Sequence, residues 1–339
     1  MPKKRLSRIL ILFCGGTVAM EQLDDEGGLG ISSRAKTINA LLNLKSMLSC
    51  MSNIDLEYVF NVDSTNMSPD LWDKIADAIS SHYDEYDGFV VIHGTDTMAY
   101  TTSALSFVLK DLGKPVVFTG AQIPAYWLET DARRNLINAV RVANMDLAGV
   151  FLVFDKSIIL GARASKITES GLQAFQSMNA PPVGEIRVHM TLRSDYRCKR
   201  HKKALALAKG FETNVAVVSL HPGMPAKILT GMLDDGIKGF VVRGYGTGNV
   251  PDEVLEFFEK ARARKIPVVV NTQCIEGRTL MHLYDVGQQA LNFGAIQAHD
   301  MSVECATTKL MWALGQGVAY SEIEAVMHQD FVGEIDDNA

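Results

Sequence analysis

The sequence lacks the cysteine and histidine patterns that form disulfides or bind metals. Its five cysteines stand at positions 14, 50, 198, 274 and 305 without a CxxC motif, and its eight histidines form no HxH or HExxH motif. An odd number of scattered cysteines argues against a disulfide scaffold and a structural zinc site, and it favours a reducing compartment. The sequence therefore predicts no metal centre.

A long apolar run is also missing. No stretch approaches the ~18–20 apolar residues that a membrane span requires. A basic segment before residues 9–13 imitates a secretory signal, but the apolar run is short and no small-x-small cleavage site follows it. A buried first strand ending at Gly15 and Gly16 explains these residues better, so we expect a cytoplasmic protein that does not bind membranes.

An excess of basic charge is absent. The chain has 33 Lys and Arg against 39 Asp and Glu, a net charge of −6, which does not attract nucleic acid or an anionic membrane. The chain does have enough hydrophobic residues to form a sizeable core. They make up 47% of its 339 residues, which excludes bulk disorder. This length favours two domains.

Short apolar runs alternate with amphipathic segments, which predicts a parallel sheet covered on both faces. The expected strands are residues 8–13, 88–92, 115–119, 149–154, 215–220, 239–242 and 267–271. The expected helices are residues 69–80, 101–110, 131–144, 225–233, 251–264, 302–314 and 321–328. The predicted fold is α/β with two domains: a larger N-terminal parallel-type sheet sandwiched by helices, and a smaller C-terminal α/β domain.

A basic segment interrupts this alternation near residues 191–210. Its cations are Arg193, Arg197, Lys199, Arg200, Lys202 and Lys203. We interpret residues 191–212 as a linker between an N-terminal domain, 1–190, and a C-terminal domain, 213–339. The alternative is a nucleic-acid patch, but aromatic residues do not alternate with the cations and the net charge is negative.

Two predicted strands run directly into glycine and then threonine. The first continues as Gly15-Gly16-Thr17, and the second as His93-Gly94-Thr95-Asp96. Ligands bind beyond the carboxyl ends of such strands, and glycine permits a ligand to approach closely. A threonine that caps a helix or turn is the ordinary alternative for either site. The first loop fits neither the GxGxxG nor the GxxxxGK[ST] nucleotide motif.

Together these two motifs resemble the paired signatures of bacterial-type L-asparaginases, and the resemblance covers almost the whole chain. Asp63-Ser64 and the segments 119–124, 161–166, 243–249 and 271–274 lie where the family has similar residues. Residues 86–90 and 272–274, with the missing secretory signal, most resemble the cytoplasmic type I branch.

The resemblance implies hydrolysis of L-asparagine to L-aspartate and ammonia by two displacements, without a cofactor. Thr17 corresponds to the nucleophile that forms an acyl-enzyme. Thr95, Asp96 and Lys166 match a second catalytic cluster, in which a neutral lysine takes a proton from Thr95 as water attacks. A surface salt bridge is the alternative reading of Lys166.

Further residues would bind the substrate. By resemblance, Asp96 holds the α-ammonium of the substrate and Ser64 its α-carboxylate, while Asp63 orients the pair; Thr95 also belongs to the substrate-binding set. Backbone groups at Gly16 and Ala121 would surround the reacting amide, where well-placed donors contribute ~10²–10³ in rate each.

The family has a mobile lid after the nucleophile, here about residues 18–33. Many members carry a lid tyrosine, yet this sequence has no tyrosine before Tyr58. Tyr284 is a candidate substitute to activate Thr17, and an ordinary loop or interface tyrosine is its alternative.

Oligomers are expected from the resemblance, either a homodimer or a dimer of dimers. Asn249 and Glu304 would complete the active site of a neighbouring subunit. A regulatory asparagine site, or alternatively a buried interface network, would involve Ser165, Arg243, Asn271, Thr272 and Cys274.

Three other functions remain open. One is mixed asparaginase–glutaminase activity, since one methylene shifts selectivity only about 10–200-fold. Another is an archaeal transamidosome component, which carries an extra N-terminal domain, whereas here the first motif starts by residue 15. The third is an amino-acid-binding sensor without catalysis, which the missing lid tyrosine favours.

Overall fold

The computed structural model describes residues 6–22, 29–31, 33–196 and 198–336. The chain forms two units. Unit 1 contains Met1–Ser177 and Pro182–Ala208, and unit 2 contains Met178–Pro181 and Lys209–Ala339. Residues 178–181 therefore belong to unit 2, although the residues before and after them belong to unit 1. The chain enters unit 2 a second time at Lys209. The basic segment from residue 191 to 208 falls in unit 1.

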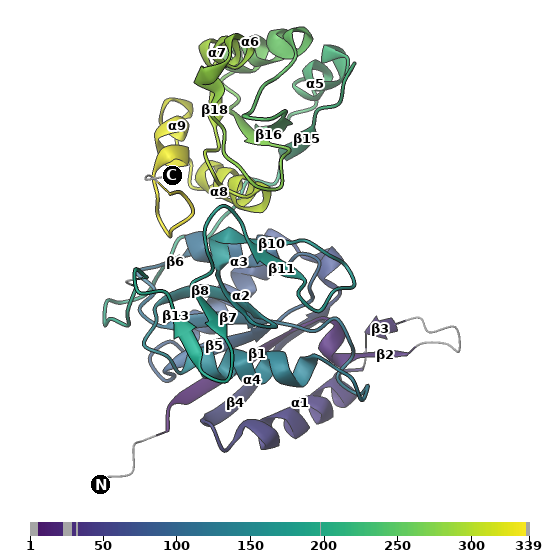
Figure 1. Cartoon of the computed structure of the whole chain (residues 1–339), viewed down its shortest axis with the longest axis vertical. Helices are drawn as coiled ribbons and strands as arrows, with labels where there is room; N and C mark the ends of the chain where they lie inside the picture. Colours follow the sequence, from purple (N-terminus) through teal and green to yellow (C-terminus); the bar gives the residue numbers. More distant parts are fainter. Residues whose placement is uncertain (1–5, 23–28, 32, 197, 337–339) are drawn as a thin grey trace. The chain divides into compact units, whose positions relative to one another are not determined.

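Unit 1 is built around an eight-stranded sheet with the order β13-β12-β9-β8-β7-β5-β1-β4 (Figure 1). Strands β4, β1, β5, β7 and β8 are mutually parallel, and β9, β12 and β13 continue the sheet antiparallel. In chain order the strands are β1 (Arg8–Gly15), β4 (Asn53–Val62), β5 (Gly88–Ile92), β7 (Pro115–Thr119), β8 (Gly149–Phe154), β9 (Ser157–Leu160), β12 (Gly184–Ile186) and β13 (Met190–Leu192).

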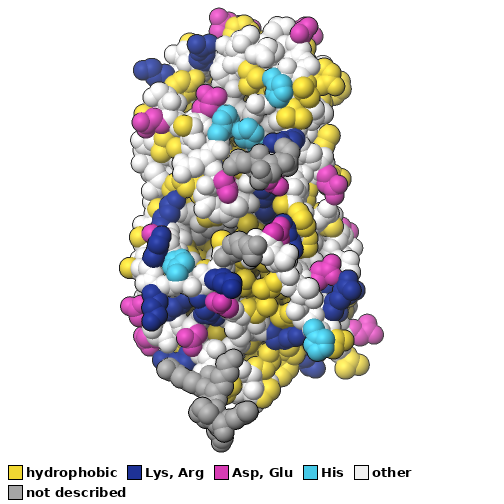
Figure 2. All heavy atoms as spheres, turned by 60° about the vertical axis from the view of Figure 1, so that its left-hand side comes forward, with side chains coloured by type: hydrophobic (Ala, Val, Ile, Leu, Met, Phe, Trp, Pro, Cys, Tyr) yellow, Lys and Arg dark blue, Asp and Glu magenta, His cyan; other side chains and the backbone are white. Residues whose placement is uncertain are grey.

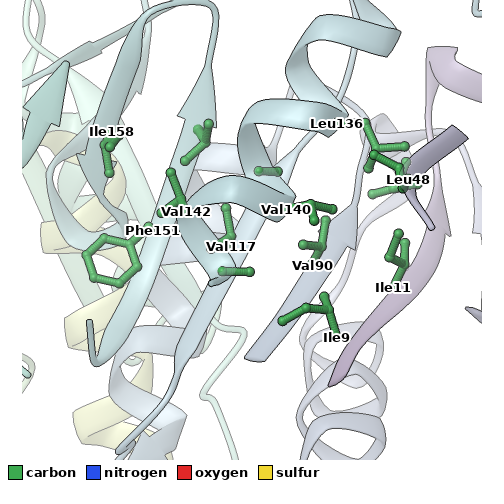
Figure 3. Packing of buried hydrophobic residues seen from close by; sticks show 14 of the residues in the cluster. Ile9, Ile11, Leu48, Val90, Val117, Leu136, Val140, Val142, Phe151 and Ile158 are labelled. Atoms are coloured by element: carbon green, nitrogen blue, oxygen red, sulfur yellow. The ribbon is translucent and has the colours of Figure 1, made fainter. Parts of the chain in front are cut away.

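Helices cover both faces of this sheet (Figure 1). On one face lie α1 (Arg34–Leu48) and α4 (Ala132–Ala143), and on the other α2 (Pro69–Ser81) and α3 (Met98–Val108). The helices α1 and α4 pack on apolar residues at alternate positions of the central strands. Ile9, Ile11 and Val90 of these strands belong to one buried cluster with Val140 of α4 (Figure 3). The central strands are buried on both faces, as parallel strands between two helical layers must be.

Smaller two-stranded pairs complete unit 1. Met20–Gln22 (β2) pairs with Leu29–Ile31 (β3), and Leu109–Lys110 (β6) pairs with Ala206–Leu207 (β14). The hairpin of Ala164–Lys166 (β10) and Phe175–Ser177 (β11) is antiparallel and separate from the main sheet.

Unit 2 contains a parallel sheet of four strands in the order β15-β16-β17-β18. The strands are β15 (Val215–Ser219), β16 (Gly239–Gly244), β17 (Val268–Thr272) and β18 (Ala295–Gln297). The helices are α5 (Ala226–Met232), α6 (Leu255–Ala263), α7 (Asp285–Asn292), α8 (Val303–Gly315) and α9 (Tyr320–His328). Phe240, Phe257 and Phe258 form the aromatic centre of its core. The two sheets confirm the predicted two-domain α/β fold.

In the part of the chain that the structure describes, no helix has both the length and the apolar character that crossing a membrane requires. Figure 2 shows that basic and acidic side chains are interspersed on the face that it draws. Cations of the basic segment form hydrogen bonds and an ion pair within unit 1. Arg200 donates to the carbonyls of Ala143 and Met145 near the end of α4, and Lys203 pairs with Asp111.

Candidate active site

The carboxyl ends of four neighbouring strands meet at one edge of the main sheet. Strands β7, β5, β1 and β4 are adjacent and parallel. The residues that follow them are Ala121, Thr95, Thr17 and Ser64 respectively, so residues far apart in the sequence end at the same sheet edge. This placement accounts for the two strand–glycine–threonine motifs as parts of one site.

Glycines let these turns approach one another. Gly16 has φ +93°, and a Cβ atom there would lie 2.6 Å from Cα of Gly94. A Cβ atom on Gly94 would in turn lie 2.6 Å from Oγ of Ser64. The turns after β1, β5 and β4 therefore pack closely together, and a larger residue at either glycine would separate them.

Lys166 reaches this edge from the β10–β11 hairpin. Its Nζ donates to Oγ1 of Thr95 at 2.8 Å and to Oδ1 of Asp96 at 2.6 Å. The lysine side chain is 16% exposed and that of Asp96 is 56% exposed. Lys166 does form a salt bridge, as the alternative reading expected, but the same ammonium also contacts a threonine hydroxyl. The structure thus brings Thr95, Asp96 and Lys166 together.

Ser64 links the turn after β4 to the turn after β5. Its Oγ accepts a hydrogen bond from the Asp96 amide at 3.3 Å, and its carbonyl accepts one from Thr97 Oγ1 at 2.7 Å. Asp63 bonds within its own turn, because Oδ1 accepts from both N and Oγ1 of Thr65 at 2.9 Å. The pair expected to contact substrate therefore shapes the loop, and substrate binding by Asp63 and Ser64 stays a prediction.

His93 is buried behind this turn and is part of a directed hydrogen-bond chain. Burial lowers the pKa of the His93 imidazole to about 4. Trp72 Nε1 donates to Thr101 Oγ1, and that hydroxyl lies 3.1 Å from His93 Nε2. His93 Nδ1 lies 2.7 Å from the carbonyl oxygen of Gly94. Because a carbonyl only accepts, the ring carries a proton on Nδ1, through which it holds the Gly94 peptide. The lowered pKa keeps the ring neutral near pH 7, so Nε2 accepts from the Thr101 hydroxyl.

Gln122 and Asp131 are site residues that sequence reasoning missed. Thr95 Oγ1 donates to Oε1 of Gln122 at 3.1 Å. The Asp131 carboxylate, 3% exposed, accepts hydrogen bonds from the backbone amides of Gln122 and Ile123. The position of Gln122, three residues after a strand that ends at the ligand-binding edge, is the signal that could have found it.

The remaining predicted residues, apart from Ser165 in β10, lie in unit 2. Arg243 and Asn271 are paired neighbours on β16 and β17, and Thr272 Oγ1 contacts the carbonyl of Gly246 and the amide of Cys274. These four residues therefore form one group. Their role as a regulatory site, together with Ser165, stays a prediction.

The other unit 2 candidates occupy different positions. Tyr284 precedes α7 and is 55% exposed. Glu304 is 8% exposed in the first turn of α8. Asn249 closes a turn with Tyr245, and among the described residues its buried Oδ1 has no hydrogen-bond partner. The activation of Thr17 by Tyr284 and the contribution of Asn249 and Glu304 to a neighbouring site stay predictions.

The lid expected at residues 18–33 lies partly outside the described residues, which omit 23–28 and 32. Within the described ranges, no group of three or more His, Cys, Asp or Glu side chains is arranged to hold a metal ion. Burial raises the pKa of the Cys14 thiol, which lies at the end of β1, so this sulfur is not a reactive thiolate.

Hydroxyl, carboxylate and lysine groups joined at the edge of a parallel sheet are groups that amide-hydrolysing enzymes use. Fold and site together therefore define the class of the protein as a hydrolase. The family model described as "Asparaginase, N-terminal" matches residues 8–197, and the model described as "Glutaminase/Asparaginase C-terminal domain" matches residues 214–327. The chain belongs to the asparaginase family, which confirms the resemblance and the predicted enzyme class.

Individual proteins are similar over nearly the whole chain. L-asparaginase 1 of Escherichia coli (strain K12) is 36% identical over 330 residues, covering 96% of this chain and 97% of that protein. The thermostable L-asparaginase from Thermococcus kodakarensis has a solved structure with a TM-score of 0.88 and 35% identity, covering 97% of this chain and 99% of the other. One component of the glutamyl-tRNA(Gln) amidotransferase of Pyrococcus abyssi is 35% identical over 347 residues, covering 98% of this chain and 78% of that protein.

Proposed function

We propose that the protein hydrolyses L-asparagine to L-aspartate and ammonia in the cytoplasm, through an acyl-enzyme on Thr17. The observation that carries the proposal is the contact of Lys166 with Thr95 and Asp96, beside the turn that presents Thr17. Family membership and the L-asparaginases similar over the whole chain support the substrate.

In the first displacement, Thr17 Oγ1 attacks the carbon of the substrate's side-chain amide. A C–O bond forms and the C–N bond breaks, so that the hydroxyl proton leaves with ammonia and an aspartyl ester remains. An alcohol is a weak nucleophile at neutral pH and requires a base, a role we assign to Tyr284.

In the second displacement, water attacks the ester carbon. The water proton passes to Thr95 Oγ1 while the hydroxyl proton of Thr95 moves to the Nζ of neutral Lys166. The C–O bond to Thr17 then breaks, and the oxygen of Thr17 recovers a proton as aspartate is released. The 2.8 Å separation of Lys166 Nζ and Thr95 Oγ1 is within the range that direct proton transfer requires.

Substrate recognition uses opposite charges at the two ends of the substrate's α-carbon. The Asp96 carboxylate suits the α-ammonium, and Ser64 suits the α-carboxylate as a hydroxyl donor. Backbone groups at Gly16 and Ala121 stabilise the charge that develops on the amide oxygen.

The proposal extends to assembly and regulation. A dimer, or a dimer of dimers, places Asn249 and Glu304 of one copy at the site of another. A second asparagine bound near Arg243, whose guanidinium suits a carboxylate, makes the rate depend sigmoidally on substrate concentration. Sedimentation velocity checks the assembly, and a strictly hyperbolic rate curve at every enzyme concentration would contradict the regulatory site.

Ammonia release from L-asparagine and L-glutamine tests the activity. We expect release from asparagine to fall by a factor of about 10⁴ or more in Thr17→Ala, because the acyl-enzyme cannot form. Thr213→Ala, an exposed threonine in unit 2, is the matched control and should retain wild-type rates. Asparagine binding without release by the wild type would contradict the proposal and favour the sensor function. Comparable rates on both amides would indicate mixed activity.

A further inference from the structure

Both ends of the Gln122 side-chain amide are engaged. Its Nε2 donates to the carbonyl of Glu169 at 2.8 Å and to that of Gly171 at 3.4 Å, and its Oε1 accepts from Thr95 Oγ1 at 3.1 Å. Because carbonyl oxygens only accept, the NH₂ group must face the β10–β11 hairpin and the oxygen must face Thr95. The amide therefore has one orientation.

This orientation determines where the hydrogen of the Thr95 hydroxyl points. While Lys166 is charged, its Nζ donates to Thr95 Oγ1, and the single hydroxyl hydrogen of Thr95 is directed at Gln122 Oε1. When Lys166 is neutral, its lone pair can accept this hydrogen if the hydroxyl rotates, while Thr95 Oγ1 keeps its place. Thr95 is 6% exposed and the Lys166 side chain is 16% exposed, so these contacts are largely shielded from solvent. Gln122 thus provides the second partner that holds Thr95 Oγ1 in place.

The backbone of Gln122 is itself held by the start of α4. The Asp131 carboxylate accepts from the amide of Gln122 at 3.1 Å and from that of Ile123 at 3.0 Å. Asn135, one helical turn later, donates through Nδ2 to Asp131 Oδ2 at 3.0 Å and to the carbonyl of Gly120 at 3.1 Å. A buried carboxylate with three such donors fixes the loop 120–123 as a rigid support.

We propose that Gln122, held in place by Asp131, is a positioning residue that ties Thr95 Oγ1 to the hairpin carrying Lys166 and so keeps Lys166 Nζ within proton-transfer distance of Thr95. The inference rests on the proposed hydrolysis, and it concerns the geometry of the proton relay, not contact with substrate. Lys166 lies on a hairpin outside the main sheet, so its distance to Thr95 depends on side-chain ties such as that made by Gln122.

Steady-state kinetics with L-asparagine test the role. Gln122→Met preserves the length of the side chain and removes both hydrogen-bonding ends. We expect kcat to fall about 10- to 100-fold, with KM changed less than about threefold, because a relay displaced by about an ångström loses that much rate. Gln173→Met, an exposed glutamine on the same hairpin, is the matched control and should keep wild-type kcat.

The outcomes separate the two proposals. Wild-type enzyme without ammonia release overturns both the hydrolysis and the positioning role. An active wild type with unchanged kcat in Gln122→Met overturns the positioning role alone. A rise in KM with kcat unchanged also overturns it, because that pattern belongs to a substrate-binding residue. Thermal unfolding of each variant verifies that it is folded.

Gln122→Glu provides a second readout. A protonated glutamic acid has one O–H donor and one C=O acceptor, as the amide has, whereas its carboxylate only accepts. The charged side chains around this group are Lys166, which contacts Thr95 and Asp96, and Asp131, which accepts from the backbone amide of Gln122. Glu169, whose carbonyl accepts from Gln122, is the fourth. We expect kcat of Gln122→Glu relative to wild type to rise as the pH is lowered from about 8 to about 5. A ratio as flat as that of Gln122→Met would overturn the proposal.

Discussion

At the scale of single residues, the site depends on groups whose hydrogen-bonding direction is unambiguous. His93 is a clear case, because the acceptor-only carbonyl of Gly94 requires a proton on Nδ1, and burial lowers the pKa of the ring to about 4, so the ring is neutral near pH 7. The imidazole next to this turn is thus a structural support for the Gly94 peptide. It is not an acid–base group at neutral pH.

The buried His93 makes stability depend on pH. Its pKa is about 4 in the folded chain, below the ~6.5 of an exposed histidine, so between these values the unfolded chain binds one more proton. Lowering the pH from about 6.5 to about 4 therefore favours unfolding. We expect wild type to lose about 3 kcal/mol more than His93→Gln across this window, as measured by urea unfolding.

His189→Gln is the matched control for this experiment. His189 is an exposed histidine of unit 1, so its removal should leave the pH dependence of stability as in wild type. Parallel curves for wild type and His93→Gln would mean that His93 does not remain neutral on folding.

The residue types of the site could be predicted from the sequence, and some of their partners could not. Thr95, Asp96 and Lys166 belong to recognisable sequence motifs, and the structure brings the three residues together as expected. Asp131 carries no motif: its importance comes from the amide groups of a loop that folds back onto it. Such contacts depend on tertiary structure, which periodicity and spacing do not contain.

At the scale of elements, the turn after β1 is the most constrained part of the site. We expect Gly16→Ala to destabilise the fold by about 2 kcal/mol or more and to abolish ammonia release. Its new Cβ would lie 2.6 Å from Gly94 Cα at a φ of +93°. Gly223→Ala is the matched control, since φ there is +78° but no heavy atom lies within 4 Å of a Cβ. Equal effects of the two variants on unfolding and activity would show that backbone strain alone matters.

Buried strands were predicted well because their pattern is simple. Gly88–Ile92, Pro115–Thr119 and Gly149–Phe154 are found with the predicted bounds. The edge strand Asn53–Val62 was missed, because Asp55 and Glu57 interrupt its apolar residues where one side faces solvent. Helix α7 was missed as well, because it has only eight residues and buries only the small residues Gly287 and Ala290.

At the scale of the whole molecule, a buried ion pair fastens the end of the described chain to unit 2. The Lys309 side chain and that of Glu334 are both 0% exposed and lie 2.7 Å apart. Lys309 also donates to the carbonyls of Met327 and Gln329, and Glu334 accepts from the amide of Val332. The pair thus satisfies the backbone of the segment after α9 in a site shielded from solvent.

Removing one charge of the Lys309–Glu334 pair should strongly destabilise the folded chain. We expect Glu334→Gln to reduce the free energy of unfolding by about 3–5 kcal/mol, because Lys309 would remain charged and buried. The double variant Lys309→Met with Glu334→Gln should recover part of this loss. Urea unfolding of the wild type, the single variant and the double variant measures the three free energies of unfolding.

The matched control is the exposed pair Glu256–Lys260 on α6, with side chains 60% and 48% exposed. Glu256→Gln should cost less than about 1 kcal/mol. A similar cost for Glu334→Gln would show that the Lys309–Glu334 pair contributes little.

The two-domain architecture could be predicted from the alternation of strands and helices, and the sheets confirm it. The path of the chain between the units could not. Residues 178–181 belong to unit 2 although unit 1 continues at Pro182, and this exchange rests on Asn179. Its side chain bonds the carbonyl of Asp300 and the amide of Gly277, about a hundred residues later, which no local pattern reveals.

That crossing has a consequence for synthesis on the ribosome. Every contact between Thr95, Gln122, Asp131 and Lys166 is made by residues before position 172. Domains fold in the order in which they emerge, so this cluster of contacts can form while unit 2 is still being translated. The two contacts of Asn179 can both form only after Asp300 has been added. Residues 178–181 are therefore among the last parts of the nascent chain to reach their final structure.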